Sequence, residues 1–394
     1  MDGLLLSSRN VLLDQGLRSA SVLVQGTRIR EVLPYDTPTP DGVRRWELGE
    51  HVIAPGLIDL HLHGAAGYSF DQAGSEQDEL AVPGILRHLA SLGVTSAQAS
   101  LASDALQAMV ARAEALNGWR ERGTQGGAEL LGVHLEGPFL AAAQCGAHDP
   151  AALRAPAPHE AEALAATAPS MITLAPELPG ATEAIRLFTD TGAVVAAGHS
   201  EAVGADLEAA VRSGLRHITH LWSGQSTTTR SGPWRVPGLL EESLASEDLT
   251  AEVIADGRHL PPTLLEIARR CLGERLIVVS DATSGAGMPE GYRYQLGTVE
   301  CEVRDGVGMV RGADSFGGST TTLPEMLRHL HQDLGWPLAE VLALGTSRPA
   351  RIAGLQHRKG SIAPGLDADL VVLDEDLRAS AVILRGAPVP CSRG

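Results

Sequence analysis

The chain of 394 residues is long enough for one large domain and a smaller one, and its 44% hydrophobic and 20% charged residues are typical of a globular protein. Its formal net charge of −17 argues against a nucleic-acid partner, because phosphate neutralisation requires a basic face. The chain lacks a secretion-like start, a membrane-length apolar run and a Cys-x-x-Cys pair, which together predict a cytoplasmic protein with no membrane partner and no disulfide framework.

Short β segments are expected at both ends of the chain. Residues 1–52 contain β-forming apolar runs separated by Gly and Asn at turn positions, and residues 359–394 repeat this pattern. We expect the two segments to form one small β-sandwich domain, because the ends of a domain's chain usually lie close together.

Between these flanks, over residues 53–358, short apolar runs alternate with stretches of helical period. The predicted strands are 57–60, 94–99, 130–135, 171–175, 194–197, 217–221, 250–255 and 276–279. Helices are expected at 83–93, 105–119, 181–192 and 262–273, and closing helices within 320–335 and 337–354. This alternation predicts a (β/α)8 barrel of the TIM type, with a doubly wound sheet as the structural alternative. A β-hairpin is expected as an insertion near 290–312.

The first predicted barrel strand ends in two histidines, His61 and His63. Alternate side chains of a strand share a face, so both imidazoles point the same way and form a chelating pair for a transition metal. A surface strand with incidental histidines is the alternative explanation. This strand is apolar and opens after Pro-Gly, however, so it is expected to be buried, and buried imidazoles need partners.

Metal-competent side chains also end four later strands. Glu136 ends the third, His199 the fifth, His220 the sixth and Asp281 the eighth. The carboxyl ends of barrel strands surround one mouth, where barrel active sites lie, so these residues are expected to converge on a metal. Each alone has an ordinary structural explanation: a core histidine, a turn acid for Glu136, or a helix N-cap for Asp281. His134, which shares a face with Glu136, is expected to support the site.

Around these residues the chain resembles the amidohydrolase superfamily and, within it, the N-acetylglucosamine-6-phosphate deacetylases. The matching motifs are PGLIDLHLHG (55–64), GVHLEGPF (132–139), AGHS (197–200), HITHLW (217–222), ADGRH (255–259), VSDATSGAG (279–287) and PGLDADLVVLD (364–374). Dihydroorotases and related enzymes resemble this layout but bridge two metals with a carboxylated lysine on strand four. Here the single lysine, Lys359, lies outside the barrel, so the resemblance leaves Glu136 as the substitute.

The resemblance implies metal-dependent hydrolysis of the N-acetyl amide of N-acetylglucosamine-6-phosphate, a small-molecule substrate of amino-sugar catabolism. The implied metal ligands are Glu136, His199, His220, His61, His63 and Asp281. Zinc is the favoured ion and iron(II) the alternative, and the His-x-His pair allows two ions in each subunit rather than one. Asp281 is also implied as the catalytic acid and base.

The implied substrate contacts are Ala147, His148, Ser223, Gly224, Arg230, Arg235, Arg258, His259, Phe316 and Gly317. Among them, His148 is also implied as a catalytic donor. An arginine from the partner of a homodimer is implied to bind the phosphate, with Arg235 the better match and Arg230 the other candidate. One departure concerns this phosphate site, because Ser223-Gly224-Gln225 replaces the usual Asn-Ala-Met and a Thr-rich insertion follows.

Two alternatives remain open from the sequence. The first keeps the chemistry but changes the substrate to N-acetylgalactosamine-6-phosphate or to an N-acyl amino acid. The second is a non-catalytic scaffold with the amidohydrolase fold, which the retention of all the metal-competent residues disfavours.

Overall fold

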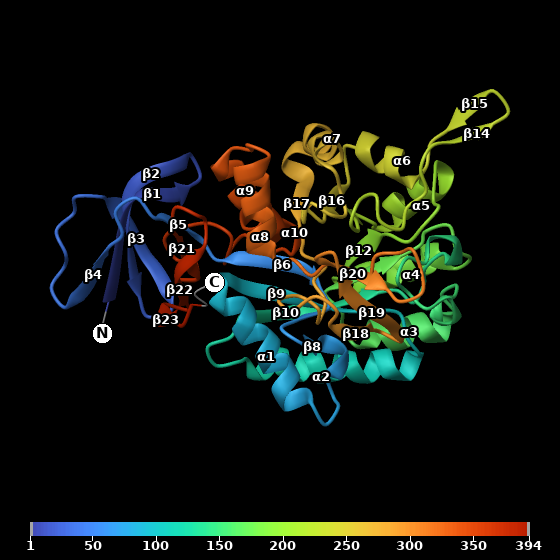
Figure 1. Ribbon diagram of the computed structural model, residues 1–394, viewed down its shortest axis with the longest axis horizontal. Helices are drawn as coiled ribbons and strands as arrows, with labels where there is room; N and C mark the ends of the chain where they lie inside the picture. The colour runs from blue at the N-terminus through green and yellow to red at the C-terminus, as the bar shows by residue number, and fades with distance from the viewer. Residues whose placement is uncertain (1–2, 392–394) are drawn as a thin grey trace.

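Two eight-stranded sheets organise the computed structural model, which describes residues 3–391. Figure 1 shows the sheet made from the two chain ends at the left and the larger barrel, with helices around it, at the right. The largest apolar cluster lies between the barrel strands and these helices and includes Leu86, Leu116 and Ile172, all of them buried. None of the helices in the described range combines the length and apolar character needed to cross a membrane.

The first sheet joins the two ends of the chain. Its strands are β1 (Gly3–Leu13), β2 (Gly16–Gln25), β3 (Arg28–Pro34), β4 (Val43–Glu47), β5 (Val52–Pro55), β21 (Leu370–Leu373), β22 (Ala379–Leu384) and β23 (Ala387–Val389). β1 pairs in parallel with β4 along its first half and with β5 along its second half, so the sheet branches there. Leu6, Val22 and Ile383 belong to its own buried cluster. The small β unit expected at the termini is therefore confirmed, as one branched sheet of mixed direction.

The second sheet is the barrel. Its strands are β6 (Leu57–Leu62), β9 (Val94–Leu101), β10 (Glu129–Glu136), β11 (Met171–Leu174), β12 (Val194–Ala197), β13 (His217–Ile218), β16 (Thr250–Val253) and β17 (Leu276–Val278). They pair in parallel and in chain order. The last strand meets the first where the Asp281 N–H donates to the His61 carbonyl at 2.9 Å and Leu62 forms a bridge with Ala282. The eight predicted strands are confirmed. The doubly wound alternative is wrong, because chain-order pairing with the ends meeting closes a barrel.

Helices cover the outside of the barrel (Figure 1). They are α1 (Asp78–Ser91), α2 (Leu106–Arg122), α3 (Pro158–Ala166), α4 (Ala181–Asp190), α5 (Ala205–Ser213), α6 (Leu239–Ala245), α7 (Pro262–Leu272), α8 (Leu323–Arg328), α9 (Leu338–Leu344) and α10 (Ser347–Ile352). The helix expected at 83–93 begins earlier, since Asp78 and Glu79 complement the helix dipole in its first turn and Pro83 is accommodated inside it. The short helices α3, α5 and α6 were not predicted.

Two insertions lie at the end of the barrel where the strands terminate. After the eighth strand, β18 (Arg293–Leu296), β19 (Val299–Arg304) and β20 (Val307–Val310) form a three-stranded antiparallel sheet, one strand more than the expected hairpin. After the sixth strand, β14 (Thr229–Ser231) and β15 (Trp234–Val236) form a hairpin that projects from the body in Figure 1. Both insertions follow carboxyl ends of barrel strands, so both belong to the end of the barrel that carries the predicted site.

Candidate metal centre

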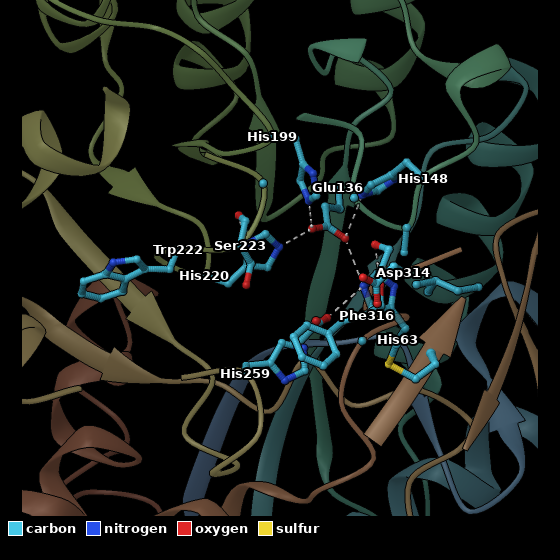
Figure 2. Close-up of a pocket in the computed structure, with 18 residues that line it drawn as sticks. His63, Glu136, His148, His199, His220, Trp222, Ser223, His259, Asp314 and Phe316 are labelled. Atoms are coloured by element: carbon cyan, nitrogen blue, oxygen red, sulfur yellow. Dashed lines mark hydrogen bonds and ion pairs between the residues drawn. The ribbon is translucent and has the colours of Figure 1, made fainter. Parts of the chain in front are cut away.

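The metal-competent side chains predicted from the sequence meet around one carboxylate, Glu136, which Figure 2 shows at the centre of the site. Its Oε1 lies 2.9 Å from His220 Nε2 and 3.2 Å from His199 Nε2. Its Oε2 lies 3.1 Å from His63 Nε2 and 3.6 Å from His61 Nε2. Each oxygen of this carboxylate therefore faces a different pair of histidines, which is the arrangement that a bridging ligand of two ions requires.

Asp281 closes the site on the side of the His-x-His pair. Its Oδ1 lies 3.4 Å from His63 Nε2 and 3.5 Å from His61 Nε2, and these three side chains form one compact, buried group. The six residues thus divide into two neighbouring sets, one around each oxygen of Glu136. The sequence-based prediction that they converge agrees with this geometry.

The backbone around the site is strained where it delivers these side chains. His199 and Asp281 follow β12 and β17 with φ values of 48° and 46°, and Trp222, beside His220, has a φ of 70°. Residues other than glycine seldom adopt this left-handed conformation, which costs about 1–2 kcal/mol. It persists where the surrounding structure enforces it, and such positions cluster at functional sites.

Hydrogen bonds fix which nitrogen of each ring faces Glu136. His199 Nδ1 donates to the Gln144 carbonyl at 2.7 Å, and His220 Nδ1 donates to the Ser223 carbonyl at 3.1 Å. A neutral imidazole that donates from Nδ1 carries a lone pair on Nε2. In its neutral form each ring thus aims the lone pair of Nε2 at Oε1 of Glu136, itself an acceptor, and such a contact is favourable only with a cation between the two atoms.

The pKa of His199 shows that a proton on its ring does not supply that cation. Burial lowers this pKa to about 4, despite the opposing hydrogen bond with Glu136. Burial also raises the pKa of Glu136, but the His61 and His148 imidazoles and hydrogen bonds with the surrounding rings outweigh it and hold this pKa well below its usual value. A neutral imidazole and an ionised carboxylate 3.2 Å apart are a ligand pair for a metal ion.

The second set of residues also attracts positive charge. Burial lowers the pKa of His63, but hydrogen bonds with Asp281 and Glu136 raise it to about 9. For Asp281, burial raises the pKa. The hydrogen bond with His63 and the charge of His61 lower it by more, so the net shift is downward and this carboxyl is ionised at neutral pH. A divalent cation competes with the proton for the same place, because metal binding releases protons from its ligands.

The distances also suit a metal. Two ligands about 2.1 Å from one tetrahedral ion are about 3.4 Å apart. The nitrogen–oxygen separations around Glu136 range from 2.9 to 3.6 Å. The residues present therefore fit a divalent ion bound by imidazole and carboxylate groups, which suits zinc or iron.

Sequence reasoning missed Glu252, a fully buried residue of β16 beneath the site. Its carboxylate accepts hydrogen bonds from His61 Nδ1 at 2.6 Å, His217 Nε2 at 3.1 Å and the His220 N–H at 3.1 Å. A signal for it existed, because a glutamate in an otherwise apolar predicted strand must find partners. His134 also lies beneath the site, with its ring centroid 4.6 Å from that of His61.

A cavity of about 370 Å³ opens onto these residues. Most of the predicted substrate contacts line it, namely Ala147, His148, Ser223, Gly224, His259 and Phe316. The insertion after the eighth strand contributes Leu296, Met309 and Asp314, which sequence reasoning missed because no local pattern marks a loop that folds back over a site. Figure 2 shows His259 and Phe316 together at one side of this cavity, with ring centroids 4.3 Å apart.

The other predicted contacts lie outside the cavity. Arg230 and Arg235 are exposed on the β14–β15 hairpin, and Arg258 is an exposed residue of the turn before His259. Gly317 packs behind the insertion, since a Cβ there would lie 2.6 Å from Cys301 Sγ, and its carbonyl accepts from the Tyr294 hydroxyl. Within the described range of residues 3–391, no lysine or arginine of the same chain lines the cavity.

His148 presents a proton to the cavity. The Ser103 N–H donates to His148 Nδ1 at 3.2 Å, so Nδ1 is the acceptor and Nε2 carries the hydrogen. Nε2 lies 3.6 Å from Glu136 Oε2, beside the position expected for a metal. His148 is therefore placed to donate a hydrogen bond to a carbonyl oxygen bound there.

Two glycines leave room for the ring of His199. A Cβ on Gly146 would lie 2.9 Å from His199 Cε1, and a Cβ on Gly224 would lie 2.5 Å from His199 Nδ1. Both glycines have positive φ values, of 55° and 63°. The unusual Ser223-Gly224 sequence therefore contacts two of the predicted metal ligands: the Ser223 carbonyl orients His220, and Gly224 leaves room for His199.

Comparison with known proteins identifies a family and named relatives of this chain. Residues 52–389 match the model of the amidohydrolase family. The chain is 35% identical to N-acetylglucosamine-6-phosphate deacetylase of Bos taurus, over 86% of this chain and 84% of the relative. It is 32% identical to N-acetylgalactosamine-6-phosphate deacetylase of Escherichia coli O157:H7, over 86% of this chain and 88% of the relative. A mutant N-acetyl-D-glucosamine-6-phosphate deacetylase of Mycobacterium smegmatis, solved with N-acetyl-D-glucosamine-6-phosphate, has a TM-score of 0.89 and 30% identity, with 100% of both chains covered.

Proposed function

This chain belongs to the amidohydrolase family, and we propose that it hydrolyses the N-acetyl amide of N-acetylglucosamine-6-phosphate to acetate and glucosamine-6-phosphate. The observation that carries this proposal is the neutral imidazole of His199, which faces the ionised Glu136 at the mouth of the barrel together with His220 Nε2. The non-catalytic scaffold is disfavoured, since the predicted metal ligands gather around Glu136 and all of them except His61 line one cavity.

The proposed metal is zinc, with iron(II) as the alternative. Glu136, His199 and His220 would hold one ion, and His61, His63 and Asp281, with the other oxygen of Glu136, would hold a second. When bound, a divalent ion supplies Lewis acidity, which lowers the pKa of water from about 15.7 to about 7 and polarises the amide carbonyl.

Asp281 is the proposed acid and base. Its low pKa keeps it ionised at neutral pH, so it accepts the proton of the attacking water as oxygen bonds to the acetyl carbon. It then delivers this proton to the amide nitrogen as the carbon–nitrogen bond breaks, and the amine leaves as a neutral group. His148 donates from Nε2 to the carbonyl oxygen as negative charge develops on it.

A phosphate group in this cavity needs a cation that the cavity itself does not offer. Glu136, Asp281 and Asp314 contribute carboxylates to its lining, and no arginine or lysine of the described residues joins them. We infer that a second copy of the chain supplies the cation in a homodimer. The β14–β15 hairpin projects from the body and carries Arg230 and Arg235 on its exposed surface, with Arg235 favoured (Figure 1).

The substrate is tested by measuring acetate release with zinc-loaded protein. N-acetylglucosamine-6-phosphate should be hydrolysed faster than the unphosphorylated sugar and than an N-acetyl amino acid. The galacto epimer is the second candidate, because a relative of similar identity is named for it. Equal rates with and without the phosphate would remove the phosphate from the proposal. Protein that binds no metal and releases no acetate from any of these compounds would refute the function.

A further inference from the structure

One buried carboxylate, Glu252, makes contacts that the reaction described above does not use. It points into the barrel from β16, and its side chain is 0% exposed. Its only ion-pair partners among residues 3–391 are the imidazoles of His61 and His217. Burying a carboxylate without an arginine or lysine is costly, so its position calls for an explanation.

The first contact determines how His61 presents its ring. Because a carboxylate only accepts hydrogen bonds, His61 Nδ1 must donate to Glu252 Oε1, 2.6 Å away. His61 Nε2 therefore points toward the cavity side, where it lies 3.6 Å from Glu136 Oε2 and 3.5 Å from Asp281 Oδ1. This nitrogen is buried and has no hydrogen-bond partner, which suits a metal ligand.

The second contact reaches the other set of ligands. The same Oε1 accepts the backbone N–H of His220 at 3.1 Å, just after the end of the sixth strand, β13. One oxygen of Glu252 thus holds His61, from the set around Asp281, and the segment that carries His220, from the set around His199. The remaining oxygen is held by His217 Nε2 at 3.1 Å.

We propose that Glu252 is a positioning residue for the second metal ion: it commits His61 to binding through Nε2 and fixes the spacing between the two sets of ligands. This proposal rests on the proposed function, because it assumes the metal site described there. Carboxylates that hold the far nitrogen of a metal-bound histidine affect metal affinity by about 10–100-fold in other proteins. A merely structural role would change the stability of the fold but not the number of bound ions.

The test compares metal binding by the wild type, Glu252→Gln and Glu252→Asp. Glutamine keeps the length and removes the charge, whereas aspartate keeps the charge and is too short for the 2.6 Å contact with His61. The matched control is Glu129→Gln, which alters a carboxylate at the opposite end of β10 from Glu136, paired with Lys359. Zinc content after dialysis and zinc affinity by chelator competition are measured, with circular dichroism to verify folding.

We expect two ions in the wild type and in Glu129→Gln. In both Glu252 variants we expect one tightly bound ion and a second whose Kd is raised about 10–100-fold. A folded Glu252 variant that holds two ions with wild-type affinity would overturn the proposal, as would a wild type that holds only one. If either result overturns the role of Glu252 while the wild type still releases acetate, the proposed function stands. A wild type with no metal and no activity would refute both the proposed function and the role of Glu252. If Glu252→Gln does not fold, Glu252→Asp decides.

Discussion

Replacing Gly224 with alanine tests whether the fit around His199 controls metal binding. The new Cβ would lie 2.5 Å from His199 Nδ1 and 2.9 Å from its Cε1. Real Cβ contacts below 3.0 Å essentially never occur, so the ring or the loop must move by about half an ångström or more. A metal site tolerates deviations of about 0.2 Å in its ligand distances, and the displaced ring is the one aimed at Glu136 Oε1.

Gly26→Ala is the matched control for this substitution. Gly26 has a φ of 60°, close to the 63° of Gly224, but a Cβ there meets nothing within 4 Å. Both variants should lose about 1–2 kcal/mol of stability from the left-handed backbone. Only Gly224→Ala should also weaken zinc binding, by about 10–100-fold, the size expected when a group that supports a metal ligand is disturbed.

The measurements are thermal unfolding of both apoproteins and chelator competition for zinc. A similar loss of thermal stability in the two variants, combined with weaker zinc binding in Gly224→Ala alone, supports the reasoning. Equal zinc affinity and equal acetate release in the two variants would show that His199 accommodates the extra methyl group, and that Gly224 has no part in the metal centre.

Asp281→Asn should fold and retain the zinc ion held by Glu136, His199 and His220, but lose about 10²–10⁴-fold in the rate of acetate release, because the proton acceptor is gone; a variant with near-normal turnover would remove Asp281 from this role. Arg235→Ala alone should be nearly inactive on the phosphorylated substrate, and mixing it with Asp281→Asn should restore activity, because a mixed dimer has one complete site. No recovery in subunits shown to exchange would contradict an arginine supplied by the partner. Burial raises the pKa of Asp59 from 3.8 to about 6, despite hydrogen bonds from Ser280 and His61. The ionised form is thus disfavoured in the folded state, so stability falls as pH rises from about 4 to 6. In the apoprotein, Asp59→Asn should remove this loss of stability, so the difference in unfolding temperature between the variant and the wild type should change between about pH 4 and 6. A difference that stays constant over this pH range would refute the prediction.

The sequence by itself predicted the barrel and the metal-competent residues that gather at its rim. Strand runs are short and apolar, and the side chains that end them stand out from their neighbours, as His199 and Asp281 do. In a parallel barrel all strands run the same way, so residues at their ends must share one rim. This rule converts positions far apart in the chain into neighbours without knowledge of the packing.

Only the tertiary structure decided which groups complete the site. Glu252 acquires its partners from two other strands, β6 and β13 with the residues that follow it, and Asp314 reaches the cavity from an insertion with no periodic pattern. The tertiary structure also leaves Arg230 and Arg235 outside the cavity of their own chain. Hydrogen bonds and contacts between distant segments depend on distances of a few tenths of an ångström, and a local pattern of hydrophobicity carries no information about them.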